Sequence, residues 1–141
     1  MTEIGDIEVI RLMLKKGREK LKTANIDFDN DRYEDSISRA YYAVFHTISA
    51  VLMSRKLHFS SHKETIGSFN REFVKTGIFP RTYTKMMQKL FNERQASDYD
   101  FGGYIGPDIA EKDLTEVMKI IDECEKYLAK LYKVPQEYWK D

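Results

Sequence analysis

Hydrophobic residues recur at intervals of three and four along most of the chain, the period of an α-helix with one buried face. This pattern predicts five helices, over about residues 6–25, 31–55, 61–76, 80–97 and 108–132. Residues 25–30 and the glycine-containing stretch 97–107 interrupt the pattern and predict connections. No segment alternates in the manner of a β-strand. The sequence therefore predicts an all-α fold, an up-and-down bundle of four or five helices that forms one domain over residues 1–141.

Several helix boundaries are marked by residues that satisfy or end the backbone hydrogen bonds of a helix. Asp31 and Ser61 each stand three residues before a glutamate, the pattern of a capping box, and predict the starts of the second and third helices. Gly77 predicts the end of the third helix, and Pro80 fits the first turn of the fourth. After the fifth helix, we expect the aromatic tail around Trp139 to fold back on the bundle, with contact to a partner as the alternative.

The composition narrows the classes of protein to be considered. The chain has 141 residues, and its 23 lysines and arginines balance 23 aspartates and glutamates, so any contact with nucleic acid is expected to be local. The single cysteine, Cys124, excludes an internal disulfide and a Cys-x-x-Cys site. No apolar run is long enough to span a bilayer, and no signal-peptide pattern is present. We therefore expect a cytoplasmic protein with no membrane contact.

The second predicted helix is apolar on two opposite faces. At about 100° per residue, one direction is the core stripe, with Ile37, Tyr41, Val44, Ile48 and Val51. The opposite direction, where a surface helix normally has lysine and glutamate, carries Arg39, Tyr42, His46, Ala50 and Met53. A helix that is apolar nearly all round must be covered on both sides, either by its own subunit or by a second copy of the protein. We expect a twofold homodimer formed around this helix.

Arg39 and His46 carry the chemistry that this outer face offers. They are seven residues apart, which is two helical turns, and Tyr42 lies between them on the same stripe. A buried arginine needs a negative partner, and one interpretation is a structural ion pair with Asp35 or with a carboxylate of another helix. The other interpretation is a phosphate. Since histidine exchanges a proton near neutral pH and arginine stabilises charge on phosphoryl oxygens, the pair suits phosphodiester cleavage without a metal.

The polar face of the first predicted helix is basic. It carries Lys15, Lys16, Arg18, Lys20 and Lys22. A solvated helix face is the expected interpretation, and a phosphate-binding patch is the alternative.

The run from Ser38 to His46, SRAYYAVFH, resembles the Arg-x(4 to 6)-His signature of the HEPN superfamily, with a spacing of six. The segments FVKTG at 73–77 and NERQASDY at 92–99 are similar to parts of small stand-alone prokaryotic HEPN proteins. The resemblance implies a helical bundle that dimerises with its two Arg-His motifs facing one another across a cleft. It also implies a metal-independent endoribonuclease, often a toxin paired with a small nucleotidyltransferase, with Arg39 and His46 as the RNA-cleaving residues.

Other members of the superfamily are binding or scaffold domains, and one position favours that alternative. Many active members have a polar residue directly after the arginine, whereas this chain has Ala40. A non-catalytic module would bind a nucleotide, RNA or the nucleotidyltransferase partner. A purely structural dimer is a third hypothesis.

Two further groups of polar residues bear on the site. Arg94 and Asp98, four residues apart, either support the Arg-His motif in the cleft or form a local ion pair at the end of the fourth helix. His58 and His62 flank a predicted turn close to Glu64, but no third ligand follows a recognised metal spacing. We therefore expect capping and solvated residues there, and neither a metal nor another cofactor.

Overall fold

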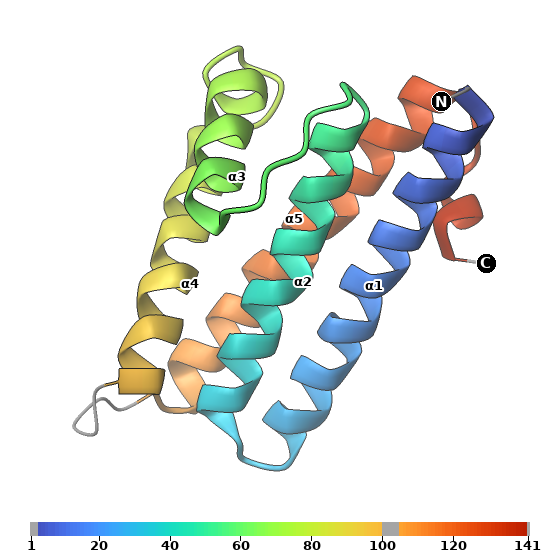
Figure 1. The fold of residues 1–141 in the computed structure, drawn as a ribbon. Coiled ribbons are helices and arrows are strands. Elements are labelled where there is room, and N and C mark those ends of the chain that lie inside the picture. Colours follow the sequence, from blue (N-terminus) through green and yellow to red (C-terminus); the bar gives the residue numbers. More distant parts are fainter. Residues whose placement is uncertain (1–2, 100–104, 141) are drawn as a thin grey trace.

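The structure is a computed structural model that describes residues 3–99 and 105–140, with side chains for 6–95 and 105–140. Every regular element in these ranges is a helix. The long helices are α1 (Glu3–Asp29), α2 (Tyr33–Met53), α3 (His62–Phe69), α4 (Arg81–Tyr99) and α5 (Pro107–Tyr132). A π-helix, η1 (Asn70–Val74), follows α3, and a 3-10 helix, η2 (Gln136–Lys140), follows α5. The predicted all-α helical bundle is confirmed (Figure 1).

α2 is the central helix of the bundle. α1 lies on one side of it, α3 and α4 lie on the other, and α5 runs behind it (Figure 1). The predicted core stripe of α2 is fully buried: Ile37, Tyr41, Val44, Ile48 and Val51. Packing within one subunit therefore accounts for most of the apolar surface of this helix.

α1 approaches α2 closely at Gly17. A Cβ atom at this position would lie 2.9 Å from the Thr47 hydroxyl oxygen and 3.0 Å from the Ala43 carbonyl oxygen, so only glycine fits without a shift. Ala43, Thr47 and Ala50 are buried and recur at helical spacing along this side of α2. The prediction that Ala50 belongs to an outer face is therefore wrong, because α1 covers this side of the helix.

The connection between α1 and α2 is shorter than predicted. α1 continues to Asp29, beyond the predicted end at residue 25, and only residues 30–32 form the turn. The capping box predicted at Asp31 is wrong: Arg32 is the N-cap of α2, and no side chain caps it. Asp31 adopts the left-handed conformation with a φ of 61°, and its carboxylate accepts a hydrogen bond from the Tyr33 hydroxyl at 2.9 Å. This tight turn directs the carboxylate away from the helix start.

The predicted third helix over 61–76 consists of two parts. Its start is as predicted, because the Ser61 hydroxyl accepts a hydrogen bond from the Glu64 backbone N–H at 3.0 Å. α3 then gives way to the wider η1, and Gly77 follows with a φ of 87°. The tail folds back as expected: Trp139 is buried, and its indole N–H donates to the Glu125 carbonyl at 3.1 Å.

Two buried carboxylates connect α5 to the other long helices. Glu125 lies on α5 and is fully buried, and its carboxylate accepts two hydrogen bonds from the guanidinium of Arg18 on α1. The distance from Arg18 Nε to Glu125 Oε2 is 2.7 Å. Arg18 therefore does not belong to the solvated face predicted for it. Asp113, also on α5, pairs with Lys89 of α4 at 2.5 Å. Charged residues recur along the described helices, and none of these helices could cross a membrane.

Candidate functional site

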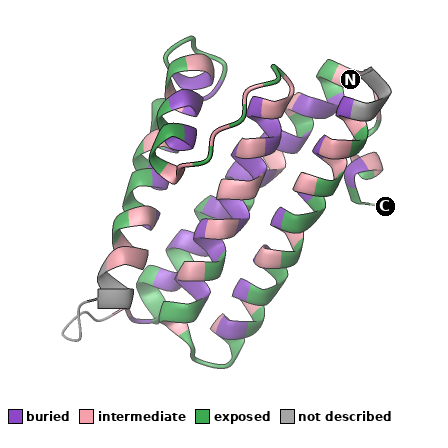
Figure 2. Cartoon of the chain, in the orientation of Figure 1, coloured by how far each residue is buried: buried purple, intermediate pink, exposed green. Residues whose placement is uncertain are grey.

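One side of α2 remains uncovered by another helix within the described residues. Figure 2 shows partly exposed positions along the side of α2 between α1 and the α3 and α4 pair. Arg39 is exposed on α2, and Tyr42, Phe45 and His46 are partly exposed. The three outer-face residues predicted as a site, Arg39, Tyr42 and His46, therefore remain accessible in this structure.

Aromatic and imidazole rings gather on this side of α2 and contact the ring of Tyr41, which belongs to the buried core stripe. We refer to Tyr41, Tyr42, Phe45, His46 and His62 as the ring cluster. His62, the first residue of α3, stacks on Phe45 with ring centroids 4.1 Å apart and lies 5.9 Å from the Tyr42 ring. His46 lies 6.0 Å from the Phe45 ring and 6.4 Å from the Tyr42 ring. The two imidazoles therefore border the same pair of aromatic rings.

Arg94 reaches the ring cluster from α4. Its guanidinium carbon lies 5.0 Å from the centroid of the Tyr42 ring and 5.5 Å from that of Tyr41, within the range of a cation–π contact. The structure thus brings this predicted supporting residue next to Tyr42. Asp98 lies in the last turn of α4, outside the residues whose side chains are described, so its predicted role and the local ion pair remain predictions.

Among the residues whose side chains are described, Arg39 does not form the structural ion pair that was one interpretation of its position on α2. It is exposed, and within the described part of the chain it has neither a hydrogen bond nor an ion pair. Asp35, the predicted partner, is exposed as well. Because the Arg39 guanidinium is in contact with water, it needs no neighbouring carboxylate to offset a burial cost. Its donors are available to an incoming anion.

The surroundings of His46 favour its neutral form. Its pKa is lowered to about 4, mainly because burial disfavours the charged imidazolium, and the positive charges of Lys16, Lys20 and His62 lower it further. Both lysines lie on α1. The sequence led us to expect a histidine that titrates near neutral pH, as an unperturbed imidazole does. In the free protein the lowered pKa instead keeps His46 uncharged at pH 7, as a neutral base.

His62 is the site residue that the sequence did not reveal. Burial and the positive charge of Arg94 lower its pKa. The sequence suggested only a capping or solvated role for His62. It could not place this residue beside α2, because no local pattern specifies the path of the connection between α2 and α3. The packing of α3 against α2 places it next to Phe45. Among the described residues no group of three or more His, Cys, Asp or Glu side chains could hold a metal.

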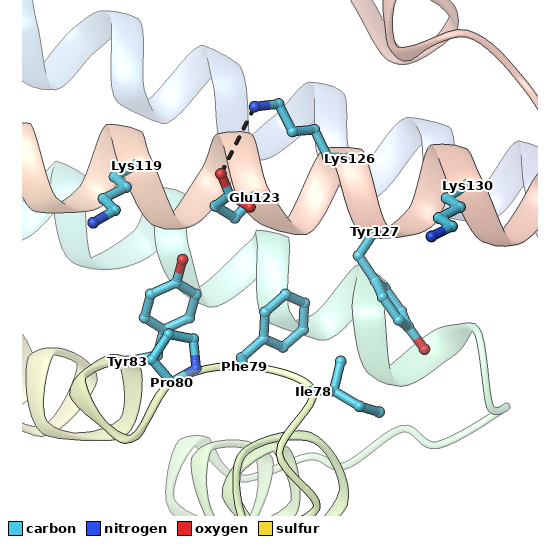
Figure 3. Close-up of a pocket in the computed structure, with 9 residues that line it drawn as sticks. All are labelled: Ile78, Phe79, Pro80, Tyr83, Lys119, Glu123, Lys126, Tyr127 and Lys130. Carbon is cyan, nitrogen blue, oxygen red and sulfur yellow. Dashed lines mark ion pairs between the residues drawn. The ribbon is translucent and has the colours of Figure 1, made fainter.

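A separate hollow of about 390 Å³ lies between residues 78–83 and α5 (Figure 3). The rings of Phe79, Tyr83 and Tyr127 line it. Lys126 is paired with Glu123 at 3.7 Å, as the dashed line in Figure 3 marks. None of the predicted site residues lines this hollow.

Comparison with known proteins connects the chain to one family. The family model described as HEPN domain matches residues 10–127, a range that contains all the predicted site residues. The chain is 36% identical over 92 residues to a UPF0332 protein of Thermotoga maritima, covering 65% of this chain and 70% of the relative. It is 31% identical over 124 residues to a Methanocaldococcus jannaschii protein named "Putative toxin MJ0605", covering 88% of this chain and 92% of the relative.

Proposed function

The chain belongs to the HEPN domain family, and on that premise we propose that it is a homodimeric, metal-independent endoribonuclease of the toxin type. One observation carries the proposal: Arg39 and His46 lie two turns apart on the uncovered side of α2, and Arg39 has no partner in the described part of the chain. A guanidinium that is open to an anion, on the same side of the helix as a neutral imidazole, suits the cleavage of a phosphodiester.

The proposed reaction uses the 2′-hydroxyl of RNA as its nucleophile. His46 Nδ1 or Nε2 accepts the 2′-hydroxyl proton, and the 2′ oxygen forms a bond to phosphorus. The bond from phosphorus to the 5′ oxygen breaks, and that oxygen leaves with a proton from water. The hydroxide that remains takes up the proton from His46 and restores the neutral imidazole. The products are a 2′,3′-cyclic phosphate and a 5′-hydroxyl. Arg39 stabilises the negative charge that builds up on the phosphoryl oxygens.

Local charge supports an anionic substrate although the net charge of the chain is zero. Lys16 and Lys20 on α1 are close enough to His46 to lower its pKa, and Arg94 lies over the Tyr42 ring. These groups supply positive charge from the helices on both sides of α2. A bound phosphate would offset that charge and raise the pKa of His46 from about 4.

The proposal includes two protein partners. A second copy of the chain would cover the uncovered side of α2 and bring two Arg39–His46 pairs into one cleft. The toxin names of the Methanocaldococcus relatives support a toxin–antitoxin pair, in which a nucleotidyltransferase encoded beside this chain is the antitoxin. The substrate would be cytoplasmic RNA.

Cleavage rates of matched variants test the proposal. With single-stranded RNA and an excess of chelator, we expect H46Q to lower kcat/KM by about 100-fold or more, because general base catalysis contributes at least that much. We expect R39A to lower kcat/KM by about 100-fold as well, because it removes the guanidinium that donates to the developing negative charge. H58Q, at an exposed histidine outside the ring cluster, is the control and keeps the wild-type rate. Wild-type activity in H46Q, with unchanged circular dichroism, would contradict the proposal.

A second candidate is a non-catalytic HEPN module that binds RNA or a nucleotide. Ala40 favours it, because in many active members of the HEPN superfamily a polar residue directly follows the arginine, whereas here that residue is a fully buried alanine. This candidate predicts that the wild-type protein binds RNA without turnover and that R39A weakens the binding. The same cleavage assay, run beside a binding assay, separates the two functions.

A further inference from the structure

The position of His62 is fixed by contacts on three sides. Ser61 caps α3 directly before it, and its ring stacks on Phe45 at 4.1 Å. Its Nδ1 atom lies 2.8 Å from the Tyr41 hydroxyl oxygen. A surface histidine that only caps a helix needs none of these ring contacts. The imidazole is therefore held in one orientation beside the outer face of α2.

The Tyr41 hydroxyl determines which nitrogen of His62 carries the proton. The Tyr41 side chain is fully buried, and burial raises its pKa to about 12, so the hydroxyl stays protonated. A buried O–H needs an acceptor, and within the described residues its only partner is Nδ1 of His62. The hydroxyl therefore donates to Nδ1, and the neutral imidazole carries its own proton on Nε2.

Within the described residues, the Nε2–H group of His62 is a donor without a partner. No other group in the described part of the chain bonds this nitrogen, and it is not among the buried polar atoms that are sealed from solvent. His46 borders the same two rings, and Arg94 is close enough to lower the pKa of His62. A donor close to the positive charge of Arg94, on the same aromatic rings as the proposed base, suits an oxygen of an RNA phosphate.

We infer that His62 binds a phosphate of the RNA through Nε2–H, with Tyr41 as the positioning residue that keeps the proton on that nitrogen. This inference rests on the proposed function, because His62 supplies a second group, besides Arg39, that holds the phosphate while His46 removes the proton. His62 is thus a second functional imidazole, contributed by α3 and not by the Arg-His motif on α2.

Two variants separate phosphate binding from a purely structural ring. The amide nitrogen of glutamine in H62Q can take the place of Nε2, whereas that of asparagine in H62N reaches only the place of Nδ1. The probe is a single-stranded RNA with 2′-O-methyl groups, which binds but cannot be cleaved. We expect H62N to bind it about tenfold more weakly and H62Q to stay within about threefold of wild type. Equal losses in both variants, no loss in either, or no binding by the wild type would overturn the inference.

The tautomer itself can be measured. In ¹⁵N NMR spectra of the whole protein, we expect His62 to be protonated on Nε2 and unprotonated on Nδ1. Y41F, which keeps the buried ring, should give a mixture of tautomers and a weaker complex with the methylated RNA. A wild-type ring protonated on Nδ1 would overturn the inference.

These experiments distinguish failure of the inference from failure of the proposed function. If His62 holds the methylated RNA as expected but the protein cuts no ordinary RNA, the nuclease proposal fails and the phosphate site stands. If the protein cuts RNA and H62N does so as fast as wild type, His62 has no such role and the nuclease proposal stands.

Discussion

At the scale of single residues, His46 combines partial burial with positive neighbours. The folded protein holds its pKa at about 4, whereas an unfolded chain titrates near its ordinary value of 6.5. Between these two values the unfolded chain binds a proton that the folded protein does not bind. The contribution of His46 to the free energy of unfolding therefore decreases as the pH falls from 6.5 toward 4.

H46Q should remove this part of the pH dependence, because glutamine does not titrate. Denaturant unfolding at pH 7 and pH 5 measures it: we expect a smaller loss of stability at pH 5 in H46Q than in the wild-type protein. H58Q serves as the control, since its exposed histidine is outside the ring cluster. If H46Q and wild type lose equal stability, His46 does not have the depressed pKa that its surroundings indicate.

The sequence could predict some of these residues and not others, for a physical reason. Arg39, Tyr42 and His46 share one helix, so the helical period alone places them along one stripe. His62 and Arg94 come from α3 and α4, and their approach to Tyr42 depends on how those helices pack against α2. A sequence pattern carries the period of one helix, but it does not carry the distances between helices.

At the scale of elements, the boundaries that follow from side-chain chemistry were predictable. The Ser61 cap and the left-handed Gly77 each have a local cause. The turn after α1 could not be predicted in the same way, because Asp31 offers a capping pattern but adopts the left-handed conformation. Likewise, nothing local reveals that α1 covers Ala50.

α4 and α5 are joined by a group of charges that should respond to pH. Burial and a hydrogen bond with Asp113 raise the pKa of Glu93 to about 7, and Lys89 pairs with both carboxylates. Glu93 Oε2 and Asp113 Oδ2 are buried and have no other partner within the described part of the chain, so one proton held between them would satisfy both. Unfolding releases that proton at neutral pH.

E93Q is therefore expected to stabilise the protein above pH 7. The folded protein keeps the Glu93 proton between pH 4.5 and about 7 while the unfolded chain loses it, so this carboxyl group makes stability decrease as the pH rises through that range. Glutamine removes the effect and can still donate to Asp113, for a gain on the order of 1 kcal/mol at pH 8. Thermal unfolding of both proteins at pH 5 and pH 8 measures the difference. A variant less stable than wild type at pH 8 would contradict this account.

At the scale of the whole molecule, zero net charge and a locally positive site occur together. Buried pairs such as Arg18 with Glu125 use charge to join the helices. Lys16 and Lys20 are close enough to His46 to lower its pKa, Arg94 lies over the Tyr42 ring, and Arg39 is exposed on α2. Total charge therefore says little about an anionic substrate here, and its distribution among the helices says more.

The ends of the RNA product test the central claim most directly. Wild-type protein incubated with single-stranded RNA and chelator should yield fragments with a 2′,3′-cyclic phosphate and a 5′-hydroxyl, which mass spectrometry identifies. H46Q should yield neither. Intact RNA after incubation with the wild-type protein, or products with a 5′-phosphate, would contradict the claim that Arg39 and His46 cleave RNA through its 2′-hydroxyl.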